Sequence, residues 1–248
     1  SMSAIIASNY LKEKLGYKSS SSFQALIHKA HQEFALLEQP VQREIDYLPN
    51  NNHFELSHSA VYLITQLAQD SKPQVVAVKE AFNQYSKDYP VLKKLFATIH
   101  RLKLRDMLSD ANRSLSGLVH ERNLVDFVSF NQAGYLGLYN MLDWELVQHR
   151  KLEKDEPLEY MSVMELTIQL LRSNTTYETI LLQNETGQLK LEHCHINAAR
   201  LLRTYIENQH GITPESFAQE TFLEELKTDM RNALKALNTL ELPEILML

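Results

Sequence analysis

Glycine and proline are scarce in this chain, with only 6 and 7 among 248 residues. These two residues supply most tight turns, because Gly accepts positive φ and Pro holds φ near −65°. Sandwiches and barrels need many such turns, whereas long helices need few. The sequence therefore predicts a mainly α protein.

Composition narrows the class of protein further. Apolar residues make up 44% and charged residues 23%, which is typical of a folded chain long enough for one large or two modest domains. The net charge is −6, so DNA contact would require a local basic patch. Cys194 is the single cysteine, which excludes an internal disulfide and suits a reducing compartment. No apolar run approaches the roughly 18 residues that span a bilayer, and no signal peptide is recognisable. We therefore expect a cytoplasmic protein with no membrane partner.

The first part of the chain predicts a small α+β domain over residues 3–88. Helices are expected at 8–15, ending at Gly16, and at 22–35, after the cap-rich run 19–22. The segment 41–57 predicts a β-hairpin, with its turn at Pro49-Asn50-Asn51-Asn52. Helices over 58–69 and 73–88 should follow, with Pro73 in the first turn of the second.

A long central helix is predicted from Pro90 to about residue 122, so that 89–123 forms a connecting helix. Apolar residues recur there in steps of three and four, with a two-residue slip between Leu102 and Leu104. Either one stripe is buried within the chain, or the helix forms a homodimer.

The last part, 124–248, is predicted to be a mostly helical domain with one hairpin. Residues 124–160 resist assignment. A capping box at Ser162 and Glu165 starts a helix to about 172, and Asn184-Glu185-Thr186-Gly187 predicts a second hairpin over about 179–192. Helices over 196–209 and 214–239 should complete the domain.

No pattern of catalytic residues is recognisable. The chain has no Gly-rich phosphate loop, zinc-finger cysteine spacing or nucleophile elbow, so we predict no enzyme, no catalytic residue and no cofactor. On a strand, His193 and His195 would share one face and Cys194 the other, and no spaced partner supplies further ligands, so no metal site is predicted. A Mg²⁺-dependent nuclease using the carboxylates between 143 and 156 is a further alternative, although no lysine-bearing strand motif of a restriction-type nuclease accompanies them.

Charge is unevenly distributed along the chain. Residues 90–122 carry seven basic and three acidic residues, a net charge of +4, whereas residues 211–248 carry three basic and seven acidic ones, a net charge of −4. These segments could pair with each other, or the basic helix could contact phosphates while the tail binds a protein. A second basic run surrounds residue 150. The candidate DNA-binding residues are Lys93, Lys94, Arg101, Lys103, Arg105, Arg150 and Lys151.

Two stretches of sequence resemble one family of bacterial proteins. The first is Leu56-Ser57-His58-Ser59-Ala60-Val61-Tyr62-Leu63-Ile64, followed by Lys72-Pro73. The second is Asn131-Gln132-Ala133-Gly134-Tyr135-Leu136-Gly137-Leu138-Tyr139, followed by Arg150-Lys151. Together they are similar to the DNA-damage-inducible protein D (DinD) family, over roughly residues 8–218. The first stretch also resembles the BRO N-terminal domain of phage antirepressors.

The DinD resemblance implies a non-enzymatic SOS-response protein that modulates RecA-type recombinase filaments on single-stranded DNA. The BRO resemblance implies the alternative, a DNA-binding antirepressor. His58 stands where the family has Arg, and a neutral imidazole would contact phosphate poorly.

The Gly-Tyr motif permits two interpretations from its chemistry alone. Gly134 and Gly137 allow close approach of another chain segment, while Tyr135 and Tyr139 combine apolar area with a hydroxyl. The motif is therefore either a packed corner or a platform that binds a partner or stacks on bases.

The acidic end also permits two interpretations. Its expected helix carries an apolar stripe of Phe217, Phe222, Leu226, Met230, Ala233 and Leu237. Either this stripe folds back on the domain, with residues 246–248 completing the core, or the helix is mobile and docks on a partner.

Overall fold

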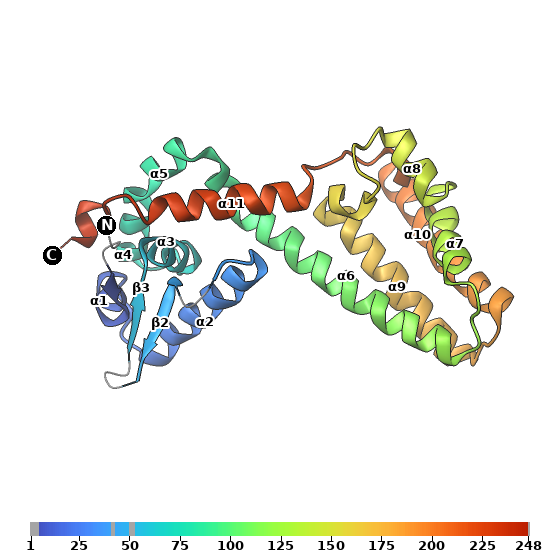
Figure 1. Cartoon of the computed structure of the whole chain (residues 1–248), viewed down its shortest axis with the longest axis horizontal. Coiled ribbons are helices and arrows are strands. Elements are labelled where there is room, and N and C mark those ends of the chain that lie inside the picture. Colours follow the sequence, from blue (N-terminus) through green and yellow to red (C-terminus); the bar gives the residue numbers. More distant parts are fainter. Residues whose placement is uncertain (1–4, 41–42, 50–52, 248) are drawn as a thin grey trace. The chain divides into compact units, whose positions relative to one another are not determined.

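The structure is a computed structural model that describes residues 5–40, 43–49 and 53–247 (Figure 1). It is mainly α-helical with one small sheet, as the sequence predicts. Two compact units are present: Ser1–Ile99 together with Glu225–Leu248, and His100–Glu224. The first unit is therefore built from both ends of the chain.

The first unit begins with helices whose ends follow the predicted capping residues. α1 (Ser8–Lys14) is followed by Gly16 at φ 74°, and α2 (Ser20–Leu36) is capped by Ser19, whose side chain accepts a hydrogen bond from the Ser22 amide. The predicted first hairpin is confirmed as β2 (Ile45–Leu48) and β3 (His53–Leu56). β1 (Ile6–Ala7) adds a third antiparallel strand, in the order β1-β3-β2. The predicted turn residues Asn50, Asn51 and Asn52 lie outside the described residues.

Short helices complete the N-terminal part of this unit. They are α3 (His58–Leu67), α4 (Pro73–Ala81), α5 (Asn83–Asp88) and the 3₁₀ helix η2 (Pro90–Lys94). The single helix predicted over 73–88 is thus divided at Phe82, which is buried and whose ring packs edge-on against Tyr62 and Tyr85. Pro73 occupies the first turn of α4, as predicted.

The C-terminal segment belongs to the core of the first unit. α11 (Leu223–Leu237), the 3₁₀ helix η5 (Glu244–Leu246) and the loop between them contribute buried side chains. These are Met230, Leu234, Leu237, Leu242 and Leu246. The apolar stripe is buried within the chain, as one of the two interpretations predicts, but from Glu225 onward it belongs to the first unit and not to the predicted domain 124–248. The helix begins at residue 223 rather than 214. Leu246 is buried, Met247 is 44% exposed, and Leu248 lies outside the described residues.

Polar contacts fix this returning segment to the start of α3. The Asn238 side chain accepts a hydrogen bond from the Ser59 amide at 2.9 Å and donates to the carboxylate of Glu44 at 3.4 Å. Glu44 is buried and also accepts from the hydroxyls of Ser57 and Ser59. A buried carboxylate needs such donors to offset its lost hydration, so this network specifies one position for the returning chain.

The regular elements of the second unit, among its described residues, are all helices. α6 (Leu95–Glu121) begins in the first unit and continues into the second, followed by α7 (Phe127–Tyr139), α8 (Asp143–Arg150) and the 3₁₀ helix η3 (Pro157–Tyr160). The long helices α9 (Val163–Gln183) and α10 (Gln188–His210) and the 3₁₀ helix η4 (Pro214–Ser216) complete it. Ser162 caps α9 through the Glu165 amide, and Gly211 at φ 65° ends α10, both as predicted.

The predicted hairpin over 179–192 is wrong, because that segment is a helix–loop–helix corner. Asn184 at φ 52° ends α9, and Gly187 at φ 88° precedes α10. The same positive-φ residues that favour a hairpin turn also favour a helix end. Ile180, Leu191 and Cys194 are buried together in one apolar cluster, at the spacing of helix faces.

The long central helix is confirmed, and its apolar stripe is buried. Before the two-residue slip, Leu95 and Ile99 are buried, and after it, Leu108 and Leu115 are buried in two different clusters of the second unit. These positions agree with the interpretation of one stripe covered within the chain. The homodimer stays a proposal.

Leu246 offers a direct test of the returning C-terminus. Its side chain is 2% exposed, whereas the neighbouring Ile245 is 42% exposed. We expect Leu246→Ala to lower the free energy of unfolding by about 2–5 kcal/mol, because it leaves a cavity in the first unit. Ile245→Ala is the matched control and should change it by less than about 1 kcal/mol. Urea unfolding followed by circular dichroism measures both, and equal values would contradict the packing described here.

Candidate functional site

The seven predicted DNA-binding residues differ in how far they are exposed. Lys93 and Lys94 are exposed on η2, and Lys151 is exposed at the end of α8. Arg105 is half-buried, with its Nε 2.7 Å from the Glu159 carboxylate and its Nη1 2.7 Å from the Ser109 hydroxyl. Lys103 is also half-buried. Of the seven candidate residues, those that are exposed to solvent are therefore all lysines.

Arg101 is a structural residue by its geometry. It is 5% exposed, and its guanidinium donates to the backbone carbonyls of Met161 at 3.1 Å, Glu159 at 3.0 Å and Thr221 at 2.9 Å. Burial lowers its pKa, opposed by the charges of nearby carboxylates. A guanidinium committed to three carbonyls fastens two loops to α6 and has little left to offer a phosphate.

Arg150 belongs to a buried polar network beside the Gly-Tyr motif. Its Nη2 lies 2.7 Å from the Glu165 carboxylate, and both side chains are at most 3% exposed. The Tyr139 hydroxyl donates to the same Glu165 oxygen at 2.7 Å and accepts from the Gln169 amide at 2.7 Å. Burial raises the pKa of Glu165, against the opposing effect of Arg150. Arg150 also donates to the Pro214 carbonyl at 3.0 Å, so the network joins α7, α8, α9 and η4.

The Gly-Tyr motif lies inside α7 and packs against α10. A Cβ on Gly137 would lie 2.6 Å from the Ile196 carbonyl oxygen, and one on Gly134 would lie 2.6 Å from Arg172 and His195. Tyr135 is 5% exposed and Tyr139 is fully buried. The four motif residues, predicted as partner-binding candidates, are buried in the interior of a helix rather than at a corner, and they offer no stacking surface.

His195 lies beneath this motif as a neutral imidazole. Its Nδ1 donates to the Phe130 carbonyl at 2.9 Å, and its ring stacks on Phe130 at 4.4 Å. Burial, with the charge of Arg172, lowers its pKa from 6.5 to about 3. Arg172 is itself buried, with its guanidinium over the Tyr135 ring at 5.3 Å. The attraction between the guanidinium and the face of the Tyr135 ring offsets part of the hydration energy that Arg172 loses on burial.

The segment His193-Cys194-His195 is helical, which corrects the strand assumed for it. Successive residues of a helix are about 100° apart, so the three side chains point in different directions. His193 is exposed, whereas Cys194 is buried in the cluster between α6, α9 and α10. Within the described ranges, no group of three or more His, Cys, Asp or Glu side chains is placed to hold a metal ion, and this includes the carboxylates between 143 and 156.

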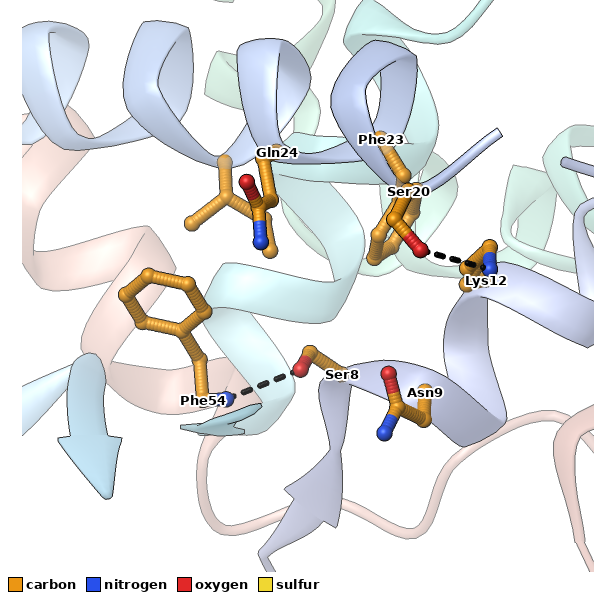
Figure 2. A pocket seen from close by; sticks show the side chains of 8 residues that line it. Ser8, Asn9, Lys12, Ser20, Phe23, Gln24 and Phe54 are labelled. Carbon is orange, nitrogen blue, oxygen red and sulfur yellow. Dashed lines mark hydrogen bonds between the residues drawn. The ribbon is translucent and has the colours of Figure 1, made fainter. Parts of the chain in front are cut away.

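Two hollows flank the first turns of α2 in the first unit. One, of about 240 Å³, lies between α1, α2 and β3 (Figure 2). In it the Ser8 hydroxyl accepts from the Phe54 amide at 2.8 Å, and Lys12 donates to the Ser20 hydroxyl at 3.1 Å. The other, of about 870 Å³, lies between α2 and the loops that precede α2 and α4, and three lysines line it. These are Lys18, Lys29 and Lys72.

Comparison with known proteins identifies the second unit. The family described as "DinD C-terminal domain" matches residues 97–226, which is more than half of the chain and nearly coincides with the unit His100–Glu224. The chain belongs to the DinD family. The DNA damage-inducible protein D of Escherichia coli is 29% identical over 170 residues, which cover 64% of this chain and 62% of that protein. No solved structure matches the chain significantly.

The DinD match covers the Gly-Tyr motif, Arg150 and the buried network, but not the hollows of the first unit. The lysines of those hollows are far apart in the chain, so no local sequence pattern predicts them. The serine run 19–22 is a local signal, but it indicates only a helix cap. No helix among the described residues of this DinD protein is long and apolar enough to span a membrane.

The two glycines Gly137 and Gly117 form a matched test of the α7–α10 contact. Gly137→Ala places a methyl group against a backbone oxygen that cannot rotate away, so we expect a loss of roughly 1–3 kcal/mol in the free energy of unfolding. A Cβ on the exposed Gly117 of α6 meets no atom within 4 Å, so Gly117→Ala should stabilise by about 0.5–1 kcal/mol. Chemical denaturation measures both, and a neutral Gly137→Ala would contradict the close approach.

His195 should make stability depend on pH. Its folded pKa of about 3 lies below the ordinary 6.5, so between these values the unfolded state binds the extra proton. The free energy of unfolding should therefore fall as the pH drops below 6.5, by up to about 1.4 kcal/mol per pH unit. His195→Asn, which keeps a donor for Phe130, should reduce this slope. His193→Asn is the exposed control on the same helix, and an equal reduction there would contradict the assignment.

Proposed function

We propose that this protein acts in the response to DNA damage by binding, and that it modulates RecA-type recombinase filaments on single-stranded DNA. The observation that carries the proposal is membership of the DinD family, together with the similarity to the DNA damage-inducible protein D of Escherichia coli. The chain spans 62% of that relative's length. The activity and partners of this protein are therefore proposals.

The arrangement of side chains supports a binding protein whose second unit is a rigid scaffold. In that unit the guanidinium groups of Arg101 and Arg150 are used for internal contacts. Exposed cations remain at Lys93 and Lys94 of the first unit and at Lys151. Lysines on a flexible stem suit phosphate contacts that do not depend on base sequence. The reducing cytoplasm is the proposed location, in keeping with the single buried Cys194.

Strand exchange with the cognate RecA-type recombinase is the direct test. We expect the protein, at a concentration stoichiometric with the recombinase, to change the rate of exchange and to alter light scattering of preformed filaments. The double variant Lys93→Glu/Lys94→Glu should weaken the effect if the exposed pair contacts the DNA, because each reversed charge removes a phosphate contact. No effect of the unmodified protein on exchange or scattering would refute the proposal.

The same preparations separate the alternative, an antirepressor related to BRO domains. Such a protein would bind a defined duplex site more tightly than single strands and would leave strand exchange unchanged. That combination would favour the antirepressor.

A further inference from the structure

The hollows on either side of α2 are basic in a chain that is acidic as a whole. The net charge of the chain is −6, yet the side chains lining the two hollows include four lysines and no carboxylate. The lysines are Lys12, Lys18, Lys29 and Lys72. Three carboxylates adjoin the lining residues in sequence: Asp70 is paired with Lys79 at 2.6 Å, Glu13 is exposed on α1, and Glu55 follows Phe54 on β3 and is half-buried. A concave surface lined by one sign of charge concentrates oppositely charged ligands.

Two of the four lysines make hydrogen bonds within the protein, and the other two face solvent. Lys72 donates to the Gly16 carbonyl at 3.3 Å and lies 4.8 Å from the centre of the Tyr17 ring, and Lys12 donates to Ser20. Lys18 and Lys29 are exposed on the wall of the larger hollow. The ridge between the hollows is the first half of α2, whose serines 19–22 are all exposed. Hydroxyls and the leading amides of a helix are further donors for an anion.

Aromatic side chains adjoin the smaller hollow. Phe54 lines it and is half-buried (Figure 2). Its cross-strand partner Tyr47 is 49% exposed, and the two ring centres are 5.1 Å apart. Exposed rings beside a basic surface suit unpaired bases, which can stack on them, whereas the bases of a duplex are already stacked on each other.

We propose that the surface around the first half of α2 binds single-stranded DNA, with Lys18 and Lys29 contacting phosphates and the Tyr47–Phe54 pair stacking on bases. This inference rests on the proposed function for its ligand, and it adds a site that lies outside the DinD match. Lys12 and Lys72 fix the loops that shape the hollows, so they are positioning residues. Lys18 and Lys29, which are exposed, supply the phosphate contacts.

The test measures the affinity of the 248-residue chain for a fluorescent oligothymidylate as a function of salt concentration. Each phosphate contact on a single strand adds about 0.7 to the salt slope, so losing two should lower the slope by about 1.4 and the affinity about 25-fold at 0.1 M salt. We therefore expect at least this loss in Lys18→Glu/Lys29→Glu. The control Lys190→Glu/Lys235→Glu makes the same change in net charge at two other exposed lysines and should bind like the unmodified protein.

The outcomes distinguish the site from the proposed function. Equal binding by the unmodified protein and Lys18→Glu/Lys29→Glu overturns the site and leaves the proposed function standing if strand exchange still responds. An equal loss in the control variant overturns the site in favour of general electrostatics. Tighter binding to a duplex of matched length overturns the choice of single strands. Absence of both DNA binding and an effect on strand exchange overturns the site and the proposed function together.

Discussion

The close approach of α7 and α10 at Gly134 and Gly137 is the constraint on which the second unit depends. With no Cβ at either position, the helix backbones come near enough for the Tyr139 hydroxyl to meet Glu165 on α9. The same carboxylate receives Arg150 from α8, and Arg150 in turn holds the chain at Pro214. A buried ion pair costs desolvation, and the hydrogen bonds of Tyr139 to Glu165 and of Arg150 to Pro214 offset part of that cost, although Arg150 Nη1 and Glu165 Oε2 are buried without a hydrogen-bond partner. The glycines and tyrosines of the family motif thus take part in packing these helices together.

Arginine and lysine are used differently among the residues considered for DNA binding. Arg101 and Arg150 lie inside and bind several acceptors each, which their rigid five-donor fork allows. Lys18, Lys29, Lys93 and Lys94 lie on the surface, where a strongly hydrated ammonium remains in water. Counting basic residues along α6 therefore overstated its cationic surface. The net charge of a segment did not reveal which cations are committed to backbone carbonyls.

The sequence was most informative where a local rule decides the outcome. Ser19, Ser162, Gly16 and Gly211 mark helix ends in the structure as predicted, because caps depend on a few neighbouring residues. Prediction failed at 179–192, where the same turn residues permit a hairpin or a helix corner and burial of Ile180 with Leu191 decides between them. Residues 124–160 escaped assignment partly because their helices end at Asn140 and Lys151, which adopt positive φ without being glycine. The hollows around α2 were not predictable locally, since distant loops supply their lysines.

The return of residues 225–248 to the first unit has a consequence for synthesis of the chain. Met230, Leu237 and Leu246 complete that core, but they are translated only after the whole second unit. The second unit is contiguous in sequence and can close as soon as α10 and η4 have left the ribosome. The first unit is made earlier, yet it must wait with part of its apolar interior uncovered. Order of translation and order of completion are therefore reversed in this protein, and the nascent N-terminal half is the part most in need of a chaperone.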